Sequence, residues 1–355
     1  MDRRGLQLRR VDALVRVVVC TDRIGALASA DAGAALGRAF VAARPGTQVA
    51  VVPLASGGPD LAEALDALGH DAVVVRDPDA DPGHHGHHDH THGDEEPTGV
   101  DPVSTSLGVG RALAEALAGR PRRVVVDLTG LLTHDGGAGL LHALGAAADV
   151  PLDAGAGGLT GITTVDLAPA RALVGDTELV AVVDPAELQD MLLGLRGLTS
   201  RRGRAAGTDP ALMLSTDAAL GALAGALGVP DAPGLGAAGG AVLALAALGG
   251  WATSGPSLCA EVAQLERTAS VADVLVTGAD HVDFATRGGH VVPEVAALGE
   301  RTMRPVVVVA RKVDISGREL RTFGVEVAYA VGGGADLGSA ELTRRAAGVA
   351  SSWTW

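Results

Sequence analysis

The feature that most constrains the fold is a short apolar run that ends in a glycine-containing polar turn and leads into a helical pattern. The clearest example is residues 274–290, VLVTGADHVDFATRGGH. Its apolar run stops at Thr277 and Gly278, two aspartates and a histidine follow, and residues 291–301 have the pattern of a helix. This is typical of a parallel strand whose carboxyl end carries a polar loop, where ligands of open α/β sheets bind. The alternative is an ordinary strand–helix turn that needs glycine only for backbone freedom.

The same strand–turn–helix pattern recurs along the chain. Apolar runs predict strands at residues 15–20, 49–53, 72–75, 123–127, 178–183, 306–309 and 325–328. Amphipathic or apolar segments predict helices at residues 61–68, 104–118, 211–227, 237–248, 291–301 and 339–349. Strands that alternate with helices favour an α/β fold with a parallel sheet and right-handed crossovers. A chain of 355 residues is long enough for about two domains.

The charge balance limits the classes of partner. A formal net charge of −14 argues against nucleic acid and anionic membrane surfaces. It leaves room for an anionic small molecule, because a local group of donors can outweigh the field of the whole protein.

Several features predict a cytoplasmic protein. Cys20 and Cys259 lack the spacing of metal ligands or of a disulfide framework, so we expect buried thiols in a reducing compartment. The N-terminal segment is too charged for a signal peptide. The uncharged residues 232–260 are too rich in Ala and Gly for a membrane span.

A histidine-rich segment interrupts the pattern at residues 77–100, DPDADPGHHGHHDHTHGDEEPTGV. It has no hydrophobic periodicity, which predicts a disordered surface loop. Its imidazoles form a potential Zn²⁺ or Ni²⁺ site. The candidate ligands are His84, His85, His87, His88, His90 and His92. The alternative is a solvated loop that binds such ions without consequence.

A second polar turn follows the strand expected at residues 123–127. It consists of Thr133, His134, Asp135, Gly136 and Gly137. Glycine at the start of a helix lets backbone N–H groups approach a phosphate or carboxylate closely. Close packing of a helix against a strand requires glycine equally, so both interpretations stay open.

Three arginines, at positions 201, 202 and 204, form a basic patch. Guanidinium groups bind phosphate. A solvated charged face is the alternative.

Five segments together resemble the bacterial type I glycerate kinase family, in order along nearly the whole chain. The family motif Asp-Ser-Phe-Lys-Gly-Ser falls on residues 22–27, and Ala-Asp-Gly-Gly-Glu-Gly falls on residues 55–60. Ser-Ala-Thr-Asn-Asp-Gly-Gly-Ala-Gly falls on residues 131–139, and Gly-Ala-Ala-Gly-Gly is intact at residues 236–240. Thr-Gly-Glu-Gly-Arg-Leu-Asp falls on residues 277–283, and the following Gly-Lys falls on Gly289 and His290.

The resemblance implies a glycerate kinase-like two-domain α/β fold. A Rossmann-like parallel-sheet domain, residues 1–60 and 255–355, would be interrupted by a second α/β domain, residues 61–254. The implied reaction transfers the γ-phosphoryl group of ATP, with Mg²⁺, to D-glycerate or a related small anionic hydroxy acid in a cleft between the domains. The implied substrate- or phosphate-binding residues are Gly57, Gly58, Thr133, Gly136, Gly137, Thr277, Gly278, His281, Gly289 and His290. A homodimer is left open.

Most charged residues of the family motifs are replaced in this chain. The family lysines correspond to Gly25 and His290, and the glutamate and arginine of the 277–283 segment correspond to Ala279 and His281. Phosphoryl transfer depends on positioning and on neutralising developing negative charge. We therefore expect the kinase activity to be reduced or lost. The remaining catalytic candidates, as metal ligand or general base, are Asp22, Asp135 and Asp283.

Histidines stand where the family has Asn, Arg and Lys. They are His134, His281 and His290, and their neighbours include Asp135, Asp280 and Asp283. If the loops converge as in the family, these side chains form a potential divalent-metal set or acid–base set. The alternative is drift at positions that tolerate any polar side chain. Three functions stay open: a divergent hydroxy-acid kinase, a non-catalytic binding or regulatory pseudoenzyme, and a divalent-metal-binding protein.

Overall fold

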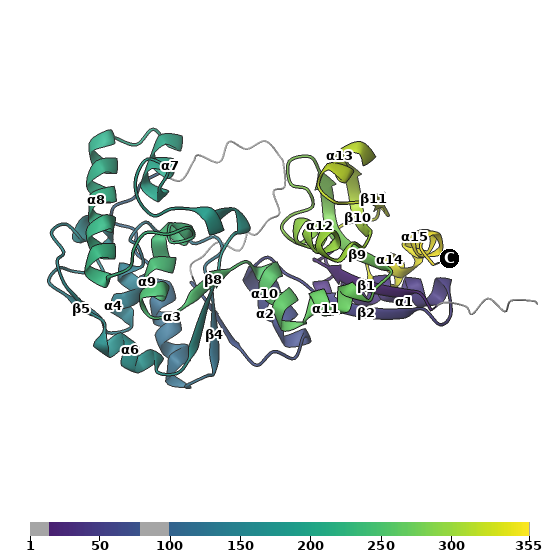
Figure 1. Ribbon diagram of the computed structural model, residues 1–355, viewed down its shortest axis with the longest axis horizontal. Helices are drawn as coiled ribbons and strands as arrows, with labels where there is room; N and C mark the ends of the chain where they lie inside the picture. The colour runs from purple at the N-terminus through teal and green to yellow at the C-terminus, as the bar shows by residue number, and fades with distance from the viewer. Residues whose placement is uncertain (1–13, 79–98, 355) are drawn as a thin grey trace, which may run out of the picture. The chain divides into compact units, whose positions relative to one another are not determined.

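The computed structural model describes residues 14–78 and 99–354 (Figure 1). This part of the chain divides into two compact units. The first unit contains the residues up to Leu54 together with those from Ala263 onward, and the second unit is Ala55–Val262. Each unit is built on its own parallel sheet, so the expected α/β fold class is confirmed. The six candidate histidine ligands between residues 84 and 92 lie outside the described residues.

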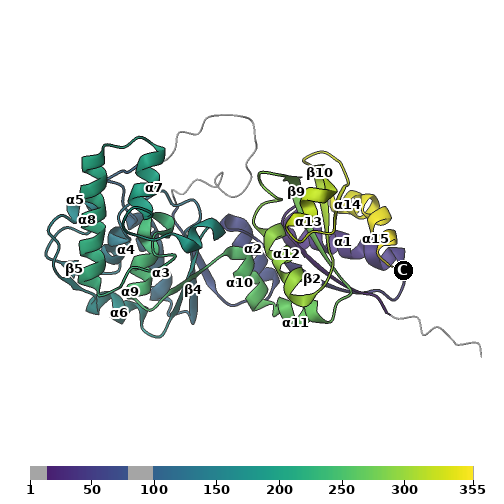
Figure 2. The ribbon, with the colours of Figure 1, turned by 45° about the horizontal axis from the view of Figure 1, so that its top comes forward.

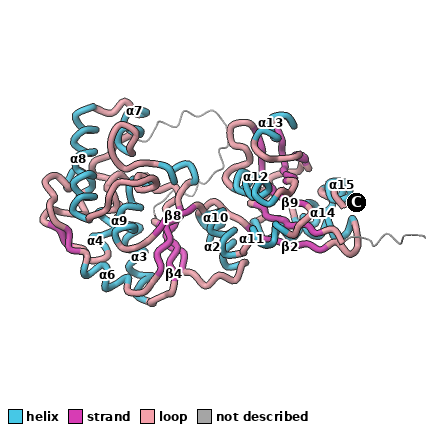
Figure 3. The backbone as a smooth tube through the Cα atoms, viewed as in Figure 1, coloured by secondary structure: helices cyan, strands magenta, loops and turns pink. Residues whose placement is uncertain are grey.

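The first unit has a five-stranded parallel sheet in the order β11-β10-β9-β1-β2, with its strands magenta in Figure 3. Its strands are β1 (Arg16–Thr21), β2 (Gln48–Pro53), β9 (Val274–Asp283), β10 (Val306–Asp314) and β11 (Val327–Ala330). Its helices are α1 (Ser29–Ala43), α11 (Leu265–Ser270), α12 (Val291–Thr302), α13 (Gly317–Thr322), α14 (Ser339–Arg345) and α15 (Ala347–Ser352).

Helices cover both faces of this sheet, as its apolar strands require. Val17 and Val19 of β1 pack with Phe40 of α1 in one buried cluster, to which α14 and α15 contribute. Successive side chains of a strand point to opposite faces. Val18 and Val308 are therefore buried on the other face, which α12 covers (Figure 2).

β9 is longer than the sequence predicted. We expected a strand at residues 274–276 followed by a polar loop, but β9 continues to Asp283 and β10 to Asp314. β1 pairs with β9 only as far as Val276, whereas β10 pairs with β9 as far as Asp283. The prediction of a loop was wrong because the two strands satisfy each other's backbone groups beyond the rest of the sheet. The polar side chains of this extension consequently have fixed directions.

The second unit has a four-stranded parallel sheet in the order β3-β4-β7-β8 and a separate antiparallel pair, β5-β6. Its strands are β3 (Val73–Arg76), β4 (Arg123–Asp127), β5 (Ala147–Ala148), β6 (Val165–Asp166), β7 (Glu178–Val182) and β8 (Trp251–Thr253). Its α-helices are α2 (Gly58–Ala67), α3 (Leu107–Ala118), α4 (Ala138–Ala143), α5 (Gly155–Gly158), α6 (Ala168–Val174), α7 (Leu198–Ala205), α8 (Pro210–Leu227), α9 (Ala241–Ala247) and α10 (Gly255–Val262). The described part of this unit also contains the 3₁₀ helices η2 (Pro185–Gln189) and η3 (Ala237–Gly240).

α8 is the one helix of the described ranges whose length and apolar composition suit a membrane span. Helices of a protein core meet the same two criteria, and Leu220 and Leu223 of α8 belong to the buried core of the second unit. The uncharged residues 232–260 form no single long helix, because they are divided among η3, α9, β8 and α10.

Both cysteines are buried free thiols, as the sequence predicted. Cys20 lies in β1 and Cys259 in α10. Burial raises the pKa of the Cys20 thiol to about 12, so this thiol stays protonated and poorly nucleophilic at neutral pH.

Candidate functional site

The first glycine loop follows β1. Asp22 comes directly after the strand; its amide donates to the Gly278 carbonyl at 3.3 Å, and its carboxylate accepts from the Arg23 amide at 2.8 Å. Gly25 has a φ of 58°, and a Cβ there would lie 2.8 Å from the Ala335 carbonyl oxygen. Position 25 is therefore closed to a side chain unless the loop shifts.

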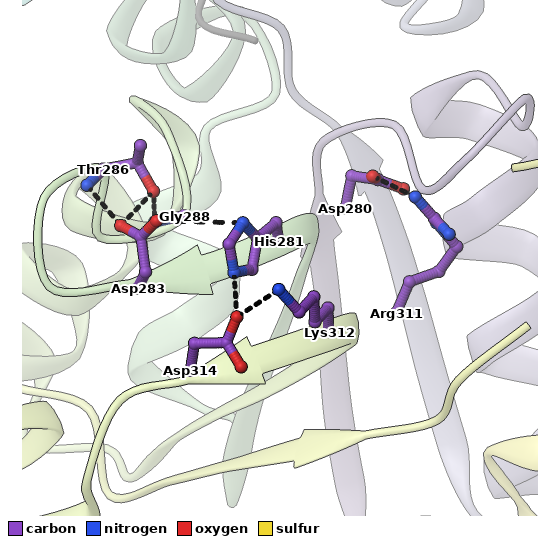
Figure 4. Close-up of polar contacts among 8 residues, drawn as sticks. All are labelled: Asp280, His281, Asp283, Thr286, Gly288, Arg311, Lys312 and Asp314. Carbon is purple, nitrogen blue, oxygen red and sulfur yellow. Dashed lines mark hydrogen bonds and ion pairs between the residues drawn. The ribbon is translucent and has the colours of Figure 1, made fainter. Parts of the chain in front are cut away.

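The amide of Gly25 is bonded to the carboxylate of Asp280 on β9, at 2.8 Å. Arg311 on β10 binds the same carboxylate through Nε at 2.5 Å and Nη2 at 2.6 Å (Figure 4). This hydrogen bonding raises the pKa of the Arg311 guanidinium above its ordinary value. Arg311 Nη1 donates to the Gly333 carbonyl at 3.1 Å. A loop amide and a guanidinium thus converge on Asp280.

A second polar group lies on the other face of β9 and β10 (Figure 4). Because side chains alternate along a strand, His281 and Asp283 point away from Asp280. His281 Nε2 lies 2.9 Å from Asp314 Oδ2, and its Nδ1 lies 3.7 Å from Asp283 Oδ2. Lys312 Nζ lies 2.5 Å from Asp314 Oδ2. The Lys312 ammonium, followed by His281, lowers the pKa of the Asp314 carboxyl below its ordinary value.

Asp283 also fixes the turn that leads to α12. Its Oδ1 accepts from the Thr286 amide at 2.7 Å and from the Thr286 hydroxyl at 2.9 Å. The Thr286 carbonyl accepts from the Gly289 amide at 2.9 Å. His290 is the residue before α12, and its side chain does not cap the helix. Gly289 and His290 therefore lie at a helix start, while Asp283 is bonded to the chain's own turn.

Thr277 and Gly278 lie inside β9. The Thr277 hydroxyl has no hydrogen-bond partner within the described ranges, and close packing accounts for Gly278. Thr277 is fully buried. A Cβ at Gly278 would lie 2.4 Å from the Thr21 hydroxyl oxygen and 2.6 Å from Ile24 Cδ1. Glycine at this position lets the first loop lie directly against the sheet.

In the second unit, Asp127 holds the start of α2. Its Oδ2 accepts from the Gly58 amide at 2.6 Å, and its Oδ1 accepts from the Thr129 amide at 3.1 Å and hydroxyl at 2.6 Å. A Cβ at Gly57 would lie 2.2 Å from Thr129 Oγ1. Sequence reasoning treated Asp127 only as the end of a strand. A carboxylate at the end of an otherwise apolar run is the sequence pattern that could have identified Asp127.

Asp135 is fully buried and anchors the loop that begins α4. Its Oδ2 accepts from the amide and the hydroxyl of Ser106, both at 2.8 Å, and from the Gly139 amide at 3.0 Å. Its Oδ1 accepts from the Gly137 amide at 3.0 Å. Asp135 thus ties the residue before α3 to the start of α4, which is a structural use of this carboxylate.

His134 is fully buried beside Asp135. Its Nε2 lies 3.0 Å from the Thr199 hydroxyl, and its Nδ1 has no hydrogen-bond partner within the described ranges. Burial, and to a smaller extent the Arg202 guanidinium, lower the pKa of the imidazole to about 4. His134 is therefore neutral at physiological pH.

The three arginines of the basic patch are bonded within the second unit. Arg201 pairs with Asp190, with Nη1 at 2.5 Å from Oδ1. Arg202 Nη1 donates to the Thr133 carbonyl at 2.7 Å. Arg204 donates to backbone carbonyls on either side of the start of α7. These arginines therefore bind groups of the same unit. Arg202 binds the backbone of the loop that contains His134.

The structure divides the predicted site residues between the two units. The first unit contains Asp22, Thr277, Gly278, His281, Asp283, Gly289 and His290. The second unit contains Gly57, Gly58, Thr133, His134, Asp135, Gly136 and Gly137. Within residues 14–78 and 99–354, no three His, Cys, Asp or Glu side chains gather closely enough to hold a metal ion.

Comparison with known proteins gives one consistent relationship. The sequence model of the Glycerate kinase family matches residues 17–348. An uncharacterized protein of Mycobacterium tuberculosis (strain CDC 1551 / Oshkosh) is 29% identical over 95% of this chain and 90% of its own length. Glycerate 2-kinase of Escherichia coli (strain K12) is 27% identical over 64% of this chain and 62% of its own length. A solved structure assigned as glycerate kinase 2 from Salmonella typhimurium LT2 has the same fold, with a TM-score of 0.70, 22% identity and 96% coverage of both chains.

The low pKa of His134 predicts a loss of stability in acid. The folded state holds this imidazole neutral down to about pH 4, whereas the unfolded chain binds a proton near the ordinary value of 6.5. The unfolded state therefore binds more protons in this window, so the free energy of unfolding falls as the pH is lowered through it. The full effect is on the order of 3 kcal/mol. Burial raises the pKa of the Glu187 carboxyl, so this group makes the free energy of unfolding change with pH in the opposite direction. The contribution of His134 is therefore measured as the difference between wild type and a variant that lacks the imidazole.

The test is denaturant unfolding of wild type and His134→Asn at several pH values. The wild-type curve should fall more steeply between pH 6.5 and pH 4 than the variant curve. Parallel curves would contradict the assignment of a buried neutral imidazole.

Asp135 should contribute mainly to stability. Asp135→Ala leaves the buried amides of Gly137, Gly139 and Ser106 without an acceptor, which should lower the free energy of unfolding by about 3–5 kcal/mol. Asp149 is the matched control, because it accepts from the Thr163 and Thr164 amides in an exposed loop. Asp149→Ala should have a much smaller effect, since water replaces the lost acceptor. Equal losses in denaturant unfolding would show that burial of Asp135 is unimportant.

Proposed function

The chain belongs to the glycerate kinase family, and we propose that it binds a small hydroxy acid but has largely lost transfer of phosphate from ATP. The observation that carries this proposal is that amides of its glycine loops are bonded to carboxylates of the chain itself. The Gly25 amide binds Asp280, the Gly58 amide binds Asp127, and the Gly137 amide binds Asp135. The backbone of the loops is kept, but donors that could face an anion are already used.

The supply of positive charge also supports a low rate. Phosphoryl transfer needs cations that neutralise the charge of the transition state, and one lost contact of this kind reduces the rate roughly 10²–10³-fold. Position 25 is glycine and position 281 is histidine where the family has lysine and arginine. The cations of β10 are engaged by neighbouring carboxylates, Arg311 by Asp280 and Lys312 by Asp314.

We choose D-glycerate as the ligand to test because two relatives of this chain are named glycerate 2-kinase and glycerate kinase. A hydroxy acid presents a carboxylate and a hydroxyl group, and Asp283 is our candidate for the acceptor of the hydroxyl proton. Its second carboxylate oxygen, Oδ2, faces His281 at 3.7 Å rather than the Thr286 turn.

ATP would bring its magnesium ion with it. Mg²⁺ is usually held by one or two carboxylates together with substrate phosphates. Asp22, which is partly exposed directly after β1, fits this requirement.

Binding without turnover is the second candidate function. The loops are fixed by internal carboxylates before any ligand is present, so a ligand would meet a preformed surface. A cytoplasmic regulatory or carrier protein of this kind would bind D-glycerate and leave ATP intact.

The two candidates are separated by a coupled ADP-release assay with D-glycerate and Mg²⁺-ATP. We expect turnover at least about 10³-fold below that of the Escherichia coli glycerate 2-kinase assayed in parallel, because several cations are missing. Any residual turnover should disappear in Asp283→Ala. Calorimetry with D-glycerate alone measures binding on the same samples.

A wild-type rate close to that of the Escherichia coli enzyme, and abolished by Asp283→Ala, would contradict the proposal of lost activity. A residual rate that Asp283→Ala leaves unchanged would remove Asp283 from the catalytic candidates.

A further inference from the structure

The carboxylate of Asp280 is held in the way that a bound anion is held. It accepts a hydrogen bond from the Gly25 amide at 2.8 Å. It also accepts from Nε and Nη2 of Arg311, side by side, at 2.5 and 2.6 Å (Figure 4). Paired guanidinium bonds plus a loop amide are a common means of binding phosphate and carboxylate groups. We propose that Gly25 and Arg311 form an oxyanion subsite and that Asp280 occupies this subsite as an internal plug. The ligand class is a phosphoryl or carboxylate anion.

The donors are held in place by contacts that do not involve Asp280. Ala26, the neighbour of Gly25, donates its amide to the Ala335 carbonyl at 2.8 Å. Arg311 Nη1 donates to the Gly333 carbonyl at 3.1 Å. The Arg311 side chain also packs near Gly25, because its Cδ lies 3.6 Å from the position of an ideal Cβ on that glycine. Removal of the Asp280 carboxylate should therefore leave an amide and a guanidinium aimed at the vacated space.

The position of this subsite in the sheet agrees with a ligand site. It lies beyond the carboxyl end of β1, on one face of the extended ends of β9 and β10, at the edge where parallel sheets bind ligands. In the resemblance described above, position 280 is a glycine of the family motif. Asp280 therefore places a carboxylate side chain at a position where the family motif has glycine.

A purely structural ion pair is the competing explanation, and the chain contains one for comparison. Arg123 binds Glu178 with Nε at 2.7 Å and Nη2 at 3.1 Å. This pair lies at the amino ends of β4 and β7, and the other bond to Glu178 comes from the Trp251 side chain at 3.1 Å. Glu178 thus has the same guanidinium geometry with side-chain donors in place of a loop amide.

The test compares anion binding by five proteins. They are wild type, Asp280→Gly, Asp280→Asn, the double variant Asp280→Gly with Arg311→Gln, and Glu178→Gly. Calorimetry and thermal unfolding are measured with inorganic pyrophosphate and, separately, with D-glycerate, at constant ionic strength. The pyrophosphate arm reports phosphoryl anions and the D-glycerate arm reports carboxylates.

We expect Asp280→Gly to bind one of the two anions at least about tenfold more tightly than wild type. The same anion should raise its unfolding midpoint, because a ligand that binds the folded state stabilises it. The double variant should lose this gain, and Glu178→Gly should never show it. Asp280→Asn keeps the size of the side chain, so it should fold if the glycine variant does not and should show a smaller gain of the same sign.

Equal anion affinity in wild type and in the folded Asp280 variants would overturn the inference. A gain that persists without Arg311, or that Glu178→Gly shows equally, would overturn it as well. None of these outcomes depends on ATP turnover, so the inference can fail or succeed independently of the proposed function.

Discussion

The structure depends on carboxylates that satisfy the amides of its glycine loops. A buried backbone N–H group needs an acceptor, and a buried carboxylate needs donors in place of water. The buried carboxylates Asp127 and Asp135 of the second unit meet both needs, and partly buried carboxylates of the first unit accept from loop amides in the same way. The pairs are Asp280 with Gly25, Asp127 with Gly58, Asp135 with Gly137 and Gly139, and Asp283 with Thr286. The loops at the carboxyl ends of the strands are consequently ordered without any bound ligand.

These interactions hold the loops through their backbone groups. The glycines serve backbone geometry and close packing, which do not depend on catalysis. A Cβ at Gly239, for example, would lie 1.8 Å from the Thr133 carbonyl oxygen, so packing requires glycine at this position of the Gly-Ala-Ala-Gly-Gly segment.

The strands were predictable because continuous apolar runs identify buried parallel strands, and β4 lies at the residues expected. The extension of β9 was not predictable, since it depends on pairing with β10, which is distant in sequence. The glycines and aspartates of the candidate site were proposed from local patterns and from the family resemblance. Their partners were not, because nothing near Asp127 or Asp280 in sequence specifies a bond to Gly58 or Arg311. Burial of His134 likewise follows from packing between loops and helices.

The central claim is that the loop amides are engaged by the protein's own carboxylates. Amide hydrogen exchange, followed by NMR in the absence of ligand, tests this most directly at Gly25, Gly58, Gly137 and Gly139. The account predicts that these amides exchange slowly before any ligand is added and change little with D-glycerate and Mg²⁺-ATP. Rapid exchange in the free protein that becomes slow only when those ligands are added would contradict it.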